Sequence, residues 1–281
     1  MSKWHLIIDV ALCHNCNNCF IACKDEHVGN DYPGYAAAQP LHGHSWIKIE
    51  QTERGRAPMV DAAFLPTMCN QCADAPCVDA GGGAVQQRED GIVVIDPEKA
   101  RGNKDIVASC PYGAIWWNEE LQLPQKWIFD AHLLDRGWAE PRCAQVCPTG
   151  AITALKSGDD DMARRAGEEK LAVLSPEFNT RPRIYYRNLH RFTHHFIGGN
   201  VLTQNDGALD CLAGATVRLL RDGAPVGEAV TDAFGEFKID GLEGGDEEYL
   251  LRLTHEDHED LEQPVRLERS VFLDDLQPTR R

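Results

Sequence analysis

The chain lacks any long hydrophobic run. Nowhere in its 281 residues do apolar side chains approach the roughly 18 in succession that a membrane-spanning helix needs. The first residues lead straight into a short strand-like run, Leu6–Val10, with no apolar targeting segment and no cleavage site. We therefore expect no membrane span and a cytoplasmic location, unless a partner that carries an export signal takes the chain with it.

Basic residues are also scarce. The 28 lysines and arginines are outnumbered by 44 aspartates and glutamates, which gives a formal net charge of −16. Proteins that bind nucleic acid need a basic face for the phosphates, so this composition argues against a nucleic-acid partner. A nucleophile–base motif, a dinucleotide fingerprint and a P-loop are missing as well. We expect no catalytic site on this chain.

Cysteine, by contrast, is abundant and unevenly distributed. Ten of the eleven cysteines lie between Cys13 and Cys147, and only Cys211 follows them. Because the count is odd and the cysteines are clustered, metal binding fits a chain of this size better than a disulfide framework does. Cys211 stands alone, and we expect it to be a buried, unreactive thiol.

Two cysteine triplets have the spacing of iron–sulfur ligands. Each needs one remote cysteine next to a proline to complete a set of four thiolates. Cys147-Pro148 suits the first triplet and Cys110-Pro111 the second, and both begin the repeated pattern Cys-Pro-x-Gly-Ala-Ile. The sequence thus predicts two [4Fe–4S] clusters, the first bound by Cys13, Cys16, Cys19 and Cys147 and the second by Cys69, Cys72, Cys77 and Cys110.

Structural zinc is the alternative for both sets, since zinc also takes four cysteines in a tetrahedral site. Zinc sites usually use two Cys-x2-Cys pairs, whereas triplets closed by a distant Cys-Pro are typical of ferredoxins. The spacing therefore favours iron. A structural or docking subunit, whose metal sites only hold the fold, remains the second functional hypothesis.

The C-terminal part has a different pattern. Period-2 alternation in 215–220 and 235–240 predicts half-buried strands, and Asp222-Gly223 predicts a hairpin turn. The charged stretch 157–170 is typical of a surface helix or linker. We divide the chain into a cluster-binding domain at 1–156, a linker at 157–195 and a β-sandwich domain at 196–281.

Three segments resemble the four-motif ferredoxin subunits that serve molybdenum enzymes of the dimethyl-sulfoxide-reductase family. These segments are Asp9–Phe20, Pro33-Gly34-Tyr35 and Gly83–Ala100. Within that family, the chain is most similar to small subunits of the pyrogallol–phloroglucinol transhydroxylase and resorcinol hydroxylase type. The resemblance covers nearly the whole chain.

The resemblance implies an α+β fold: a ferredoxin-like domain with a cluster-binding core derived from four motifs, then an all-β sandwich of the transthyretin or carboxypeptidase-regulatory type. It also implies a non-catalytic electron-transfer subunit in a heterodimer or higher assembly. The large partner would carry bis-molybdopterin guanine dinucleotide and act on a phenolic substrate. Net hydroxylation and internal hydroxyl transfer both remain open.

Two of the family's clusters lack ligands here. All ligands of one are missing together, around Gly81 and in 101–109. Those of the other would fall at Cys23, Trp127, Asp130 and Cys143. Either Asp130 completes a [3Fe–4S] cluster with Cys23 and Cys143, or Trp127 and Phe129 fill the emptied cavity. We expect the cluster to be lost, because carboxylate is a poor match to a soft cluster.

Overall fold

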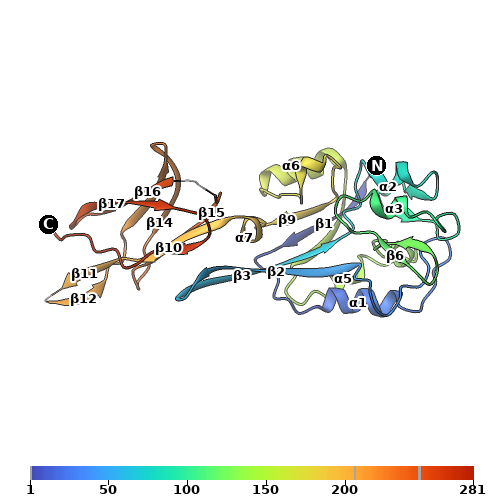
Figure 1. Cartoon of the computed structure of the whole chain (residues 1–281), viewed down its shortest axis with the longest axis horizontal. Helices are drawn as coiled ribbons and strands as arrows, with labels where there is room; N and C mark the ends of the chain where they lie inside the picture. Colours follow the sequence, from blue (N-terminus) through green and yellow to red (C-terminus); the bar gives the residue numbers. More distant parts are fainter. Residues whose placement is uncertain (1, 206, 246–247) are drawn as a thin grey trace. The chain divides into compact units, whose positions relative to one another are not determined.

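The computed structural model describes residues 2–205, 207–245 and 248–281, and it contains two compact units (Figure 1). Unit 1 comprises Met1–Glu50 and Phe64–Leu189, and unit 2 comprises Gln51–Ala63 and His190–Arg281. Strands β2 (Ile47–Arg56) and β3 (Met59–Met68) form one hairpin. Its residues Gln51–Ala63, which include the turn, belong to unit 2. No helix in the described residues is long and apolar enough to cross a membrane.

Unit 1 is built on a three-stranded sheet in the order β8–β1–β9. The central strand β1 (Lys3–Asp9) pairs antiparallel with β8 (Ile152–Ser157) and parallel with β9 (Ile184–Arg187). All of β1 except Lys3 is buried, which is the pattern of a strand covered on both faces. The predicted strand at Leu6–Val10 is therefore present, and the first cysteine loop follows it directly.

Short elements occupy the rest of unit 1, so that loops carry much of the chain. The helices are α1 (Asn18–His27), α2 (Pro76–Ala80), α3 (Asp105–Ala108), α4 (Ala131–Leu134), α5 (Arg142–Gln145) and α6 (Asp159–Glu168), with a 3-10 turn η1 (Pro176–Phe178). Two small hairpins are formed by β4 (Val85–Gln87) with β5 (Val93–Ile95) and by β6 (Trp116–Asn118) with β7 (Leu123–Gln125).

Residues 157–189, expected within a linker, are part of unit 1. The charged stretch forms the surface helix α6, but the chain then returns to the sheet as β9. Ala172 and Tyr186 exchange backbone hydrogen bonds of 2.9 and 2.8 Å, and Tyr186 is fully buried. The four residues of β9 are too few to show a clear strand pattern in the sequence. Their pairing with β1, which is far away in the chain, is visible only in the structure.

Unit 2 is mostly β. One sheet has the order β15–β10–β18, another has the order β14–β13–β16–β17, and β11 and β12 form a separate hairpin. Apolar side chains of both larger sheets, among them Ile197, Phe237, Val217 and Leu251, share one core. The elements are α7 (His190–Thr193), β10 (His195–Asn200), β11 (Leu202–Asn205), β12 (Ala208–Cys211), β13 (Thr216–Arg221), β14 (Ala224–Val230), β15 (Glu236–Leu242), β16 (Glu248–His255), β17 (His258–Arg266) and β18 (Val271–Phe272).

The predicted turn at Asp222-Gly223 is confirmed. β13 and β14 pair antiparallel with Arg221 opposite Ala224, which leaves these two residues as the hairpin loop. Their φ values of 51° and 79° are both positive, as a type I′ turn requires.

The expectation that Cys211 is buried is wrong. Cys211 ends β12, whose four residues are all exposed. Strands β11 and β12 form a separate two-stranded sheet rather than part of the larger sheets of unit 2.

Candidate metal centres

The first predicted ligand set gathers at one end of the central sheet of unit 1. Cys13 and Cys16 lie in the loop after β1, Cys19 lies in the first turn of α1, and Cys147 lies between α5 and β8. Because β1 and β8 are neighbours, with Ile8 opposite Ile152, the loops that carry these cysteines meet. Within the first loop, Asn15 and Asn17 have positive φ values of 54° and 61°, which turn the backbone sharply between successive cysteines.

The four thiols of this set lie close enough to influence one another. Burial raises the pKa of Cys19 to about 12, a hydrogen bond from the Phe20 N–H opposes the shift, and the charges of Cys13, Cys16 and Cys147 add to it. Such a group of neighbouring thiols suits a soft metal centre that binds them as thiolates. The backbone N–H that points at Cys19 is also the kind of donor that iron–sulfur ligands receive.

The second predicted set lines a single cavity of unit 1. Cys69 and Cys72 follow β3, Cys77 lies in α2, and Cys110 follows α3. All four line the cavity together with apolar residues that include Pro76, Val93 and Ile115. A cradle of four thiols with largely apolar walls fits a cubane cluster by its donor chemistry.

Burial also dominates the electrostatics of the second set. It raises the pKa of Cys72 to about 12, where the charge of Cys69 adds to the shift and the Thr180 hydroxyl opposes it. It raises the pKa of Cys77 to about 11, where the ammonium of Lys126 is the largest opposing influence. This set is therefore the more enclosed of the two, since Cys16 in the first set is exposed.

The two remote cysteines occupy the same kind of turn. The N–H of Gly113 donates to the Cys110 carbonyl at 3.1 Å, and the N–H of Gly150 donates to the Cys147 carbonyl at 3.2 Å. Both glycines have positive φ, 60° and 67°, which L side chains rarely adopt. The repeat read from the sequence thus corresponds to a repeated local structure.

Two large aromatic side chains are buried at the doubtful third site. Trp127 and Phe129 have no exposed surface, and their ring centroids lie 4.9 Å apart. Asp130 Oδ1 lies 3.1 Å from His27 Nε2, and Asp130 Oδ2 accepts the backbone N–H of Arg142 at 2.8 Å. Both carboxylate oxygens are thus engaged within the protein. Among the four positions of this site, only Cys23 and Cys143 offer thiols, which is two fewer than a [4Fe–4S] cluster takes.

A single-ion site has different requirements from a cluster. Within the residues that the structure describes, no group of three or more His, Cys, Asp or Glu side chains is placed to hold one metal ion. A cubane cluster instead distributes its four thiolates over four irons, so its ligands lie further apart than those of one zinc ion.

Sequence analysis did not single out Lys126, which lies beside the second set. Lys126 is 1% exposed, and its Nζ donates to the backbone carbonyls of Val93 and of Trp127, the latter at 3.3 Å. The one available signal was its position in the otherwise uncharged stretch Leu123–Phe129.

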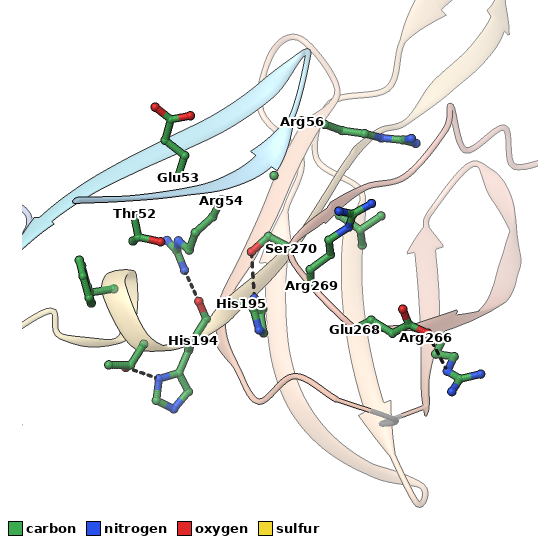
Figure 2. Close-up of a pocket in the computed structure, with 14 residues that line it drawn as sticks. Thr52, Glu53, Arg54, Arg56, His194, His195, Arg266, Glu268, Arg269 and Ser270 are labelled. Atoms are coloured by element: carbon green, nitrogen blue, oxygen red, sulfur yellow. Dashed lines mark hydrogen bonds and ion pairs between the residues drawn. The ribbon is translucent and has the colours of Figure 1, made fainter. Parts of the chain in front are cut away.

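Unit 2 contains a pocket of different chemistry (Figure 2). In this pocket the Ser270 Oγ accepts a hydrogen bond from the Phe196 N–H at 3.1 Å and lies 3.5 Å from His195 Nδ1. The shorter contact of the serine hydroxyl is therefore with the backbone. Arg54 donates to Asp240 at 2.8 Å and to the His194 carbonyl at 2.9 Å, which holds the pocket wall together. The pocket is lined by Thr52, Glu53, Arg54, Gly55, Arg56, Phe192, Thr193, His194, His195, Arg266, Glu268, Arg269, Ser270 and Val271.

Known proteins share both the cluster region and nearly the full length of this chain. The family described as "4Fe-4S dicluster domain" matches residues 60–157. The small subunit of pyrogallol hydroxytransferase from Pelobacter acidigallici is 47% identical over 256 residues, which cover 90% of this chain and 91% of that subunit. The chain belongs to the iron–sulfur subunits of the dimethyl-sulfoxide-reductase family.

Other members of this family are more distant. One subunit of tetrathionate reductase from Salmonella typhimurium is 32% identical, over 66% of this chain and 73% of its own length. One subunit of selenate reductase from Mesobacillus selenatarsenatis is 36% identical, over 66% of this chain and 71% of its own length. The family predicted from the resemblance of three segments is confirmed, and membership favours an electron-transfer subunit over a scaffold.

Proposed function

We propose that this iron–sulfur subunit relays single electrons to or from a molybdenum-bearing catalytic subunit through two [4Fe–4S] clusters. Four thiols converge at each of two places although they come from distant parts of the sequence, and this convergence carries the proposal. The ligands are Cys13, Cys16, Cys19 and Cys147 for the first cluster and Cys69, Cys72, Cys77 and Cys110 for the second.

The bound clusters supply reversible one-electron chemistry, and the chain sets how readily it occurs. Backbone N–H groups that point at sulfur stabilise the thiolates, as Tyr112 and Ala114 do for Cys110. Burial of the second set limits water around the sulfurs, whereas the first set lies nearer the surface. These differences give the two sites different reduction potentials.

We propose two clusters rather than three. The packed rings of Trp127 and Phe129 support this number, as do the two hydrogen-bonded oxygens of Asp130. In a [3Fe–4S] cluster bound by Cys23, Asp130 and Cys143, iron would compete with His27 or with the Arg142 N–H for an Asp130 oxygen.

We propose a ferredoxin-like cluster core for unit 1 and a transthyretin- or carboxypeptidase-regulatory-like sandwich for unit 2. The paired Cys-Pro-x-Gly turns support the first assignment, and two sheets that share one core support the second. Unit 2 contains none of the eight ligands, so we assign it a structural or docking role.

We propose that the partner is a large catalytic subunit with bis-molybdopterin guanine dinucleotide and a phenolic substrate, in a cytoplasmic heterodimer or higher assembly. The name of the Pelobacter relative, a hydroxytransferase, supports hydroxyl transfer between phenols. Such a transfer needs no net exit of electrons, which suits a chain with fewer clusters than its four-motif relatives.

The partner would dock beside the first cluster. Three large apolar side chains are exposed in this part of unit 1: Leu12 at 43%, Ile21 at 57% and Leu41 at 64%. Lys24 of α1 donates to the Leu41 carbonyl at 3.2 Å, which brings Leu41 beside the helix that carries Ile21. Exposed apolar side chains next to an exposed ligand loop offer both buried area and a short electron path.

A redox titration followed by electron paramagnetic resonance (EPR) tests the proposed function on the anaerobically purified complex. We expect two clusters that each accept and release one electron reversibly. A complex that retains its metal but shows no redox cycling would leave only the structural role.

A further inference from the structure

Lys126 is a buried lysine with no carboxylate partner in the part of the chain that the structure describes. The side chain is 1% exposed, and its Nζ contacts only the carbonyl oxygens of Val93 and Trp127. Across 2–205, 207–245 and 248–281, no carboxylate lies within ion-pair distance of Lys126. Buried lysines are rare and costly unless a negative charge lies nearby.

The contacts of Lys126 place it directly behind the wall of the second cysteine site. Val93, whose carbonyl accepts from Lys126, lines the same cavity as Cys77 and Cys110. The ammonium also favours the charged thiolate form of both cysteines, although burial outweighs it and leaves the pKa of each raised.

A hydrogen-bond network fixes the position of this charge. Gln71, which lies between the ligands Cys69 and Cys72, accepts the Val93 N–H at 2.8 Å and donates to the Trp127 carbonyl at 3.0 Å. Gln71 and Lys126 thus share both Val93 and Trp127 as partners. These hydrogen bonds connect the ligand loop to the buried lysine and keep its ammonium away from solvent in this structure.

The second cluster, once bound, supplies the negative charge that Lys126 lacks among its protein contacts. Four thiolates exceed the positive charge of a [4Fe–4S] core, so the complete site is an anion. Reduction adds one electron, taken from the donor, and makes the site more negative without forming or breaking a bond. A fixed cation in a low-dielectric wall therefore stabilises the reduced state more than the oxidised state.

We propose that Lys126 is the counter-ion of the second cluster and raises the reduction potential of that cluster. This inference rests on the proposed function, because it requires a cluster at the second set. It assigns the Lys126 charge a role in setting the electron equilibrium between the two clusters.

The test is a redox titration of the anaerobically purified complex that carries Lys126→Gln. Glutamine keeps a donor for the two carbonyls but removes the charge. We expect the ratio of reduced to oxidised second cluster at a fixed potential to fall about tenfold, which is about 59 mV for one electron. The first cluster serves as an internal reference and should keep its potential. Lys99→Gln is the matched control, since Lys99 is 61% exposed and paired with Asp96.

The outcomes separate this inference from the proposed function. Two clusters in the wild type with an unchanged second potential in Lys126→Gln would overturn the role of the charge and leave the proposed function intact. A wild-type complex without redox-active clusters would remove both. If Lys126→Gln loses the second cluster, the Lys126→Arg variant is measured next. Retention of the second cluster in Lys126→Arg supports the requirement for a positive charge, and loss of the cluster refutes that requirement.

Discussion

Single cysteines in this chain differ in what surrounds the sulfur. Eight of the eleven belong to the two converging sets, and each set is closed by a cysteine that precedes a proline. Cys23 and Cys143 are buried and belong to neither set, and Cys211 is exposed on β12. The same chemical change should therefore have different consequences in the three groups.

Replacement of a proposed ligand should remove one cluster. We expect Cys77→Ala to lower the iron content of the purified complex by about four atoms per chain, because three thiolates from the second set cannot complete the cube. The EPR signal of the first cluster should persist. Cys211→Ala is the control and should leave the iron content unchanged; a full complement of iron in Cys77→Ala would refute the assigned ligand set.

Replacement of Cys23 should leave the iron content unchanged. The Asp130 carboxylate already bonds His27 and the Arg142 N–H, so Cys23 has no cluster to hold in the proposed structure. We expect Cys23→Ala to keep the wild-type iron count in elemental analysis. A fall of about three irons per chain would instead establish the [3Fe–4S] alternative at Cys23, Asp130 and Cys143.

The ligand residues were predictable from sequence because they are defined by spacing. Triplets of cysteines and a repeated Cys-Pro pattern can be recognised in the sequence without any knowledge of the fold. Lys126 was not predictable, since a lysine in a short polar–apolar stretch is normally exposed, and only the path of the loops shows that it is enclosed. The burial of Cys211 was misjudged because a local strand pattern does not reveal whether the strand joins a larger sheet.

At the level of elements, the turns after Cys110 and Cys147 depend on glycine. Gly150 and Gly167 form a matched pair within unit 1, because an added Cβ would meet no atom within 4 Å at either position. They differ in backbone conformation: Gly150 has a φ of 67°, whereas Gly167 lies within the helix α6.

We expect opposite effects from alanine at these two positions. Gly150→Ala should lower the free energy of unfolding by about 1–2 kcal/mol, because an L side chain is strained at positive φ. Gly167→Ala should raise it by about 0.5–1 kcal/mol through better helix propensity. Urea unfolding followed by circular dichroism measures both; equal effects of the two substitutions would show that the turn does not require glycine.

Local patterns predicted elements better than they predicted connections. The strand at β1 and the Asp222-Gly223 turn were predictable, because alternation and turn chemistry act over a few residues. The return of β9 to the sheet and the assignment of Gln51–Ala63 to unit 2 depend on pairings between distant segments. Such pairings leave no signature in one short stretch.

At the scale of the whole molecule, the proposed electron relay needs a catalytic subunit docked beside the first cluster. We expect Ile21→Glu to weaken that association by about tenfold or more, since a charge would be buried in the interface. Val230→Glu is the control, because Val230 is 58% exposed on β14, away from the cysteines in sequence. Dissociation constants of the two complexes, measured with the same purified catalytic subunit, decide the matter; equal values would exclude this docking face.

The most direct test of the central claim is a count of iron, zinc and molybdenum in the complex purified anaerobically from its native host. We expect about eight irons per copy of this chain, which is two cubes of four, together with molybdenum on the partner and little zinc. Zinc in place of iron would contradict this claim, because the thiolate sets would then hold the fold and carry no electrons.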